Sequence, residues 1–135
     1  NTTHDVVYLD PPYNERQYSS NYHLLETIAK YDNPTIKWKT GLRDYSSQKS
    51  LYCKKSEVLK SFDDLIQNID AKYVFISYNC EWLMSLEEIK EIMSKRGEYW
   101  VFTQEYKRFK ADKTENRIHK KDTVTEYLHY VKIKN

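Results

Sequence analysis

The residues with the clearest chemical meaning are four consecutive side chains near the start of the chain, Asp10-Pro11-Pro12-Tyr13. They follow a short apolar run, Val6-Val7-Tyr8-Leu9, which predicts a buried strand. Because proline lacks a backbone N–H and restricts φ, the loop is stiff and its carbonyl groups are left unpaired. The Asp10 carboxylate and the Pro11 carbonyl can then accept hydrogen bonds from one NH2 group, and Tyr13 offers a stacking face. A flat base with an exocyclic amine fits this loop, whereas an ordinary turn could also use Pro-Pro.

A second candidate group, Ser77-Tyr78-Asn79, ends the next apolar run of the chain. Ligands of open α/β sheets bind outside the carboxyl ends of the parallel strands. We therefore expect Tyr78 and Asn79 to face the same crevice as Asp10. The alternative is an ordinary exit from a strand, with Asn79 as a turn former.

A basic segment, 107–121, holds seven Lys and Arg residues against two acidic ones, Asp112 and Glu115. So many charges and so few apolar side chains do not favour packing in a core, and they suit contacts to phosphates. A solvated loop between two strands would have the same composition. The candidate phosphate contacts are Lys107, Arg108, Lys110, Lys113 and Arg117.

Several polar residues follow the tetrapeptide closely and are candidates for contacts to nucleic acid: Arg16, Gln17, Tyr18 and Asn21. Tyr18 could stack on a base, and the others could contact a backbone. They could equally form the polar approach to a helix. The histidines His4, His23, His119 and His129 are scattered without ligand spacing, so no metal site is expected.

The elements that must position these residues alternate between strand and helix. Strands are predicted at about 6–9, 73–78, 98–106 and 124–132. Apolar periodicity predicts helices at about 21–31, 55–69 and 85–96, the last opened by a capping box of Ser85 and Glu88 and closed by Gly97. The faces expected to enter the core are Leu24, Leu25, Ile28 and Ala29 in the first helix, Val58, Phe62, Leu65, Ile66 and Ile69 in the second, and Leu86, Ile89, Ile92 and Met93 in the third. Residues 34–52 have no clear period and are predicted to be a long loop. The continuous apolar run 73–78 is typical of a strand that is covered on both faces.

This alternation predicts an α/β fold, because a strand, a helix and a second strand connect most readily as parallel neighbours. The last two strands have no helix between them and should form an antiparallel hairpin. We therefore expect a partial Rossmann-like sheet, mainly parallel, with helices on its faces and one antiparallel edge strand.

Composition limits the broader possibilities. A chain of 135 residues is one domain at most, and its net charge of +2 favours no particular partner. The two cysteines, Cys53 and Cys80, suggest neither a disulfide framework nor a metal site. No apolar run approaches membrane length and no signal peptide is visible. An intracellular protein without membrane contact is the expectation, and the oligomeric state is open.

The run Val6–Tyr13 resembles the catalytic motif of the amino-group DNA methyltransferases, especially the Dam-like adenine-N6 enzymes of bacterial restriction–modification systems. Four other stretches are similar to a branch of that family: 14–18, 21–27, 76–79 and 106–128. The resemblance implies S-adenosylmethionine as methyl donor and a flipped-out adenine of double-stranded DNA as acceptor. It assigns catalysis to Asp10, Pro11, Pro12 and Tyr13, and donor binding to Asp10, Tyr78 and Asn79.

The resemblance covers only the second half of such an enzyme. A complete relative carries a glycine loop that approaches the donor and a separate target-recognition region, and neither is present in residues 1–135. We therefore expect the C-terminal, catalytic-motif part of a bacterial cytoplasmic enzyme, inactive without the missing N-terminal half. Two other interpretations remain open: a methyltransferase for cytosine N4, RNA adenine or protein glutamine, and a non-catalytic DNA-binding module.

Overall fold

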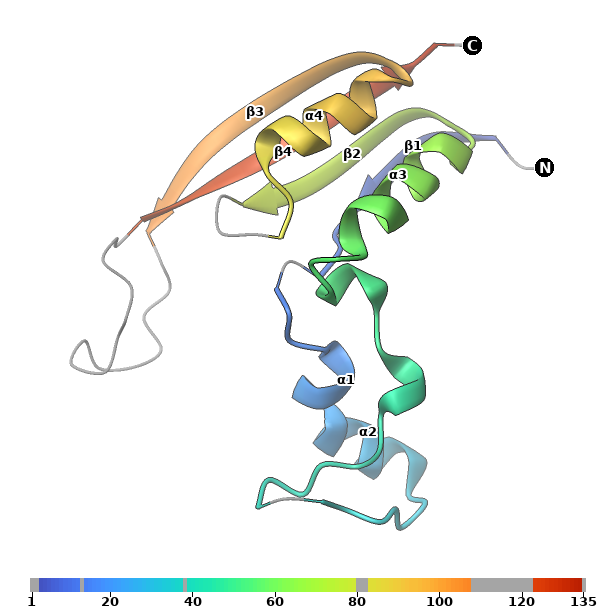
Figure 1. The fold of residues 1–135 in the computed structure, drawn as a ribbon, viewed down its shortest axis with the longest axis vertical. Coiled ribbons are helices and arrows are strands. Elements are labelled where there is room, and N and C mark those ends of the chain that lie inside the picture. Colours follow the sequence, from blue (N-terminus) through green and yellow to red (C-terminus); the bar gives the residue numbers. More distant parts are fainter. Residues whose placement is uncertain (1–2, 13, 38, 80–82, 108–122, 135) are drawn as a thin grey trace.

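Four strands form one mixed sheet: β1 (His4–Leu9), β2 (Ala71–Asn79), β3 (Gly97–Lys107) and β4 (Thr123–Ile133). The computed structural model describes residues 3–12, 14–37, 39–79, 83–107 and 123–134. The strand order is β1-β2-β4-β3 (Figure 1). β1 and β2 are parallel, with Leu9 opposite Ile76, whereas β4 is antiparallel to both of its neighbours.

The mixed α/β class and the antiparallel hairpin of β3 and β4 are confirmed, but two details of the predicted sheet are wrong. Only the β1–β2 ladder is parallel, and the antiparallel strand β4 lies inside the sheet with β3 at its edge. The physical reason lies in the side chains of β4. His129 and Val131 are fully buried, so β4 belongs at the centre, where the helices cover it.

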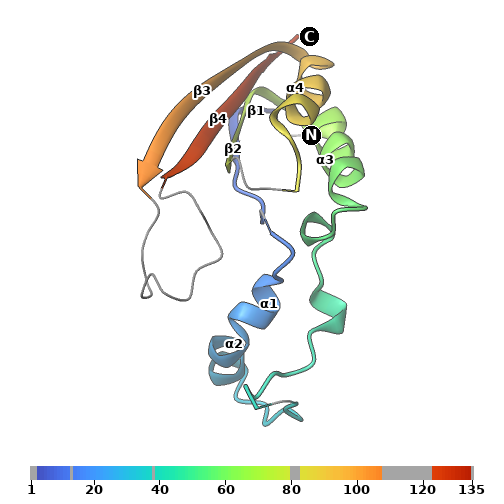
Figure 2. The same ribbon diagram turned by 60° about the vertical axis from the view of Figure 1, so that its left-hand side comes forward.

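Two helices cover one face of this sheet, namely α3 (Val58–Asn68) and α4 (Leu86–Ser94). Figure 2 shows both on the same side. Their predicted apolar faces are confirmed: the core contains Val58, Phe62 and Ile66 from α3, and Ile89, Ile92 and Met93 from α4. The predicted capping box is also present, since Ser85 Oγ accepts from the Glu88 amide at 3.2 Å and Glu88 Oε2 accepts from the Ser85 amide at 2.7 Å.

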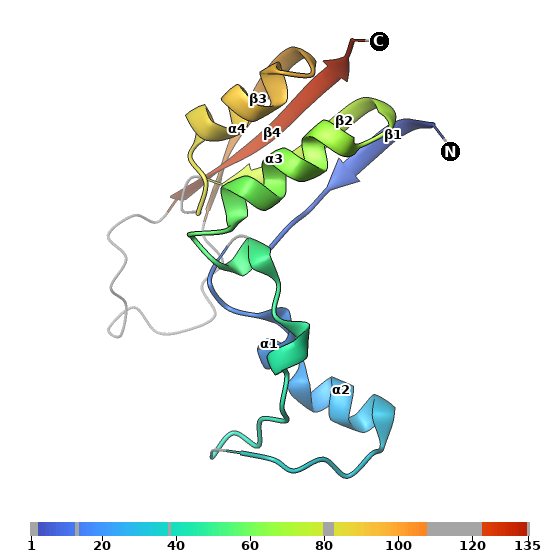
Figure 3. The same cartoon turned by 45° about the vertical axis from the view of Figure 1, so that its right-hand side comes forward.

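A helical arm extends beyond the carboxyl edge of the sheet (Figure 3). It contains α1 (Tyr18–Asn21), α2 (His23–Lys30) and a returning segment with two 3-10 turns, η1 (Ser46–Gln48) and η2 (Leu51–Cys53). Gln17, just before α1, joins the outgoing and returning parts of the arm. Its side chain donates to the Ser50 carbonyl at 3.2 Å and accepts from the Ser50 amide at 2.7 Å. The predicted long loop at 34–52 is thus confirmed, apart from these short turns.

The helix predicted over 21–31 is confirmed as α2, with the short α1 directly before it, but the expected core face of this helix is wrong. Leu24, Leu25 and Ile28 are all more than 60% exposed, and α2 has no buried residue. The reason is that α2 stands away from the sheet and the described residues leave none of its side chains buried. No helix in the described parts of the chain is both long and apolar enough to cross a membrane.

Gly97 does not cap α4, as its sequence position suggested, because Lys95 is the capping residue and Gly97 begins β3. A Cβ atom at Gly97 would lie 2.0 Å from the Lys132 carbonyl oxygen and 2.9 Å from its carbon. Glycine is therefore required here because the backbone of β4 approaches too closely for a side chain.

Gly97→Ala should consequently lower the free energy of unfolding by about 1–3 kcal/mol, the usual cost of forcing an extra group into a filled space. Urea unfolding followed by circular dichroism measures this loss. Glu98→Ala, at the next and exposed position, is the matched control and should change stability by less than about 0.5 kcal/mol. Equal stability of the two variants would contradict the close approach.

Candidate active site

The carboxyl ends of β1 and β2 meet at one edge of the sheet, because the two strands are parallel and their ladder ends at Leu9 and Ile76. Asp10 follows β1 directly, and Ser77, Tyr78 and Asn79 form the end of β2. The structure thus brings the two predicted groups of site residues to the same edge of the sheet. That they face one crevice stays a prediction, because neither Tyr78 nor Asn79 lines the pocket at Asp10.

The Asp10-Pro11-Pro12 loop lies beside a pocket of about 280 Å³. The two prolines are half-buried and Asp10 is exposed. Among the described residues, no hydrogen bond or ion pair engages the Asp10 carboxylate, so it is available to a ligand. The walls of the pocket are apolar and come from the ends of β1 and β2 and from the helix layer: Tyr8, Leu9, Tyr52, Phe62, Leu65 and Ile76.

Tyr52 is a wall of this pocket that sequence reasoning missed. It lies in η2, on the segment that returns from the arm, and its hydroxyl donates to the Ser61 carbonyl of α3 at 3.2 Å. Burial raises the pKa of its phenol. No sequence signal pointed to Tyr52, because it belongs to the polar stretch without periodicity.

Tyr78 and Asn79 point to opposite sides of β2. Tyr78 is only 1% exposed and faces the helix layer, where burial raises its pKa to about 12. Asn79 is half-buried, and its amide donates to Glu126 Oε1 of β4 at 3.4 Å. Tyr78 therefore supports the edge from within the core, whereas Asn79 lies among polar side chains.

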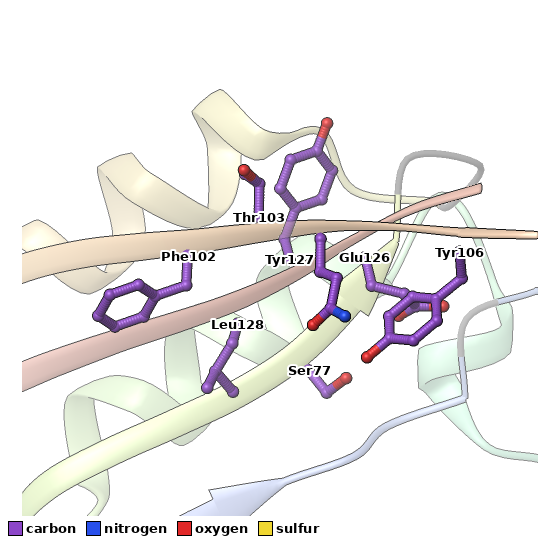
Figure 4. A pocket seen from close by; sticks show the side chains of 8 residues that line it. Ser77, Phe102, Thr103, Tyr106, Glu126, Tyr127 and Leu128 are labelled. Atoms are coloured by element: carbon purple, nitrogen blue, oxygen red, sulfur yellow. The ribbon is translucent and has the colours of Figure 1, made fainter. Parts of the chain in front are cut away.

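A second pocket, of about 520 Å³, lies along β3 and β4 near this edge (Figure 4). Figure 4 shows Ser77, Glu126 and Tyr106 on the same side of the sheet, with Phe102 and Leu128 further along the strands. The pocket combines hydrogen-bonding groups with aromatic surface, and Gln104 also lines it. Sequence reasoning did not identify Glu126 or Gln104, because their pairing across two strands appears only in the folded sheet.

A buried polar pair lies behind the edge, on the helix side of the sheet. His129 is fully buried and its Nδ1 lies 2.7 Å from the Tyr99 hydroxyl. Burial lowers the pKa of His129 to about 4 and raises the pKa of Tyr99 to about 12. Both groups are therefore neutral at pH 7, and the pair forms part of the core.

The candidate nucleic-acid contacts are placed as follows. Arg16, Tyr18 and Asn21 are exposed at the base of the arm, and Tyr18 stacks on Tyr22 with 5.9 Å between ring centroids. Lys107 is exposed at the end of β3. The other candidates lie outside the described residues: Tyr13, Arg108, Lys110, Lys113 and Arg117.

Few of the described groups at this edge could contact a cofactor, and no glycine loop lies there among the described residues. Asp10 and Asn79 offer hydrogen-bonding groups at a strand edge, but the chain contains only two glycines, Gly41 and Gly97. Gly41 lies in the arm with φ of 68°, and Gly97 faces the backbone of β4, so neither forms a loop at this edge. In the described part of the chain, no cluster of His, Cys, Asp and Glu could hold a metal ion.

Comparison with known proteins identifies the class to which this fold and this loop belong. Residues 1–95 match the family model of the D12 class N6 adenine-specific DNA methyltransferases. This match spans most of the chain, and the chain therefore belongs to that family.

The relatives agree with this assignment. The chain is 55% identical, over 96% of its length, to the type II methyltransferase M.NlaIII of Neisseria lactamica. It is 44% identical, over 94% of its length, to the type II methyltransferase M.FokI of Planomicrobium okeanokoites. The matched part is only 38% of the first protein and 20% of the second, so the chain spans well under half of these relatives. No solved structure matches the chain.

Proposed function

We propose that the chain forms the catalytic-loop part of a DNA methyltransferase that modifies the N6 amine of adenine in a restriction–modification system. One observation carries the proposal. The stiff Asp10-Pro11-Pro12 loop leaves a strand at the same edge as Asn79, in a chain that belongs to the D12 class. The exposed carboxylate without a partner among the described residues supports it further.

In this proposal Asp10 and the Pro11 carbonyl accept hydrogen bonds from the two N–H groups of the target amine. These bonds favour a tetrahedral nitrogen and stabilise the positive charge that develops on it, which is preorganised electrostatic catalysis. Because the acceptors are held by a strand end and two prolines, they need little reorganisation. The target adenine is paired in duplex DNA, so it must be flipped out to reach the loop, where Tyr13 would stack on it.

The methyl donor, S-adenosylmethionine, would supply an electrophilic methyl group to that nitrogen. Asp10 and Asn79 are the residues of this chain that would contact the donor, with Tyr78 supporting them from the core. Asn79 is already oriented by Glu126, which accepts from its amide at 3.4 Å. The glycine loop of the donor site would have to come from outside residues 1–135, so the chain alone should be inactive.

Contacts to DNA would come from two places. Arg16, Tyr18 and Asn21 lie on the arm directly after the catalytic loop, and Lys107 begins the basic segment, with Arg108, Lys110, Lys113 and Arg117 beyond it. Cationic side chains on both sides of the loop would bind phosphates and fix the register of the duplex. These contacts would position the DNA without reading its sequence.

The acceptor can be tested with the native polypeptide that contains this chain, purified from its own gene. Labelled S-adenosylmethionine should transfer methyl groups to adenine in duplex DNA. Matched duplexes lacking adenine at the target, an RNA of the same sequence and a glutamine peptide should remain unlabelled. Labelling confined to cytosine, RNA or the peptide would replace the proposed acceptor, and DNA binding without any labelling would favour a non-catalytic module.

A further inference from the structure

A tight turn at the far end of the arm takes no part in the candidate active site. It consists of Lys37 and residues 39–43, and we call it the basic turn. The Lys37 amide donates to the Leu42 carbonyl at 2.7 Å, and the Leu42 amide donates to the Lys37 carbonyl at 2.8 Å. Figure 1 shows this part of the arm at the bottom of the view, away from the sheet.

The basic turn is held in one shape and in one place. Gly41 has φ of 68°, in the left-handed region that residues with a side chain rarely adopt. Arg43 joins the turn to the end of α2, because its Nη2 and Nη1 atoms donate to the two carboxylate oxygens of Asp32 at 2.6 and 3.2 Å. The Arg43 side chain is only 11% exposed. Its charge therefore stabilises the arm itself.

The base of the arm connects the basic turn to the Asp10 loop. Two hydrogen bonds pair Gln17 with Ser50, and the Cys53 thiol donates to the Arg16 carbonyl at 3.4 Å. These bonds join the outgoing and returning parts of the chain close to the sheet. A group bound at the basic turn is consequently held in a defined position relative to the loop.

Two cations of the basic turn have no counter-ion among the described residues. Lys37 and Lys39 are exposed, and neither forms an ion pair within the described part of the chain. Asp44 attracts Lys37, but the pKa of Asp44 is lowered chiefly by the Ser46 amide, which donates to its carboxylate at 3.0 Å. A rigid turn with two such lysines suits an anionic partner, because little conformational entropy is lost on binding.

We infer that the basic turn binds phosphates of the DNA backbone outside the target base pair, through Lys37 and Lys39. The inference rests on the proposed function, which makes duplex DNA the substrate. The arm carries these lysines beyond the carboxyl edge of the sheet, where Asp10 lies (Figure 3). A phosphate held there fixes how the duplex lies over the loop. Lys37 and Lys39 are therefore positioning residues.

The chemistry of lysine also defines what the basic turn cannot do. An ammonium group binds phosphate as a point charge, without the paired geometry by which arginine recognises a guanine edge. The turn should consequently contribute equally to binding at any DNA sequence. Each phosphate contact also releases counterions from the duplex, so the contribution of the turn should appear in the salt dependence of DNA affinity.

The test uses the native polypeptide from its own gene and a fluorescent duplex, with the dissociation constant measured by anisotropy over a range of salt concentrations. The double variant Lys37→Gln/Lys39→Gln should reduce the slope of log affinity against log salt by about one for each lysine. Its KM for DNA should rise at unchanged kcat and unchanged thermal midpoint. Lys37→Arg/Lys39→Arg should keep the wild-type slope, because the charge is retained.

The matched control is Lys60→Gln/Lys90→Gln, which removes the same charge from exposed positions of α3 and α4. Its slope should equal that of the wild type. Protection of Lys37 and Lys39 from acetylation by bound DNA, with Lys60 unprotected, gives the same comparison without substitutions.

Three results would overturn the inference. The slope of the glutamine variant could equal that of the control, or the arginine variant could lose as much slope as the glutamine variant. A lower thermal midpoint with an unchanged slope would assign the turn to a contact with protein. Duplex binding with the expected slopes but without adenine methylation would sink only the proposed catalysis. Methylation of adenine with all slopes equal would sink only the role of the basic turn.

Discussion

Asp10→Ala in the native polypeptide should lower kcat for adenine methylation about 10²- to 10³-fold, the usual effect of removing one preorganised hydrogen-bonding group from a reacting centre. The carboxylate is exposed and lacks a partner among the described residues, so its loss should leave folding almost unchanged. Single-turnover methylation with saturating DNA measures the chemical step. DNA affinity, measured by fluorescence anisotropy at fixed salt, should change little.

Asp10→Asn is the matched control for this experiment. Asparagine keeps one acceptor oxygen in the same place and loses the negative charge. Its rate should lie between those of the wild type and Asp10→Ala if the acceptor oxygen and the charge both contribute. If Asp10→Ala methylates adenine at the wild-type rate, Asp10 is not part of the catalytic site.

Acid should destabilise the fold through His129, with about 3 kcal/mol lost between pH 6.5 and pH 4. The pKa of the buried imidazole is lowered to about 4, below its unfolded value of about 6.5. The unfolded state therefore binds a proton first as the pH falls, and the stability that is present above pH 6.5 is lost down to pH 4. Urea unfolding midpoints at several pH values within this window measure the loss.

His129→Gln should remove most of this pH dependence, whatever its effect on stability at pH 7. Glutamine does not titrate, so no proton is taken up on unfolding at this position. His4→Gln, at an exposed position of β1, is the control and should leave the acid-induced loss in place. An unchanged pH profile in His129→Gln would show that other groups cause the loss.

The secondary-structure elements predicted best from the sequence were those whose formation depends on residues close together in the chain. The apolar period of 3.6 residues located α3 and α4, and the Ser85–Glu88 capping box fixed the start of α4. The same reasoning located α2 but was wrong about its packing, because periodicity shows which face a helix could bury and not whether a partner is present. Gly97 was misassigned for a related reason: its constraint is the backbone of β4, about 35 residues away in sequence.

The amino-acid sequence by itself determined the stiff loop that we propose to be catalytic. The apolar run sets the strand before it, and Pro11 and Pro12 restrict their own dihedral angles. The sequence also determined the family, through identity along nearly the whole chain. Only the tertiary structure decided that β4 inserts between β2 and β3. That insertion placed Glu126 beside Asn79, buried His129 against Tyr99 and stacked Tyr130 between Phe75 and Trp100. These contacts join residues that are distant in sequence, and their partners are chosen by the packing of the whole sheet.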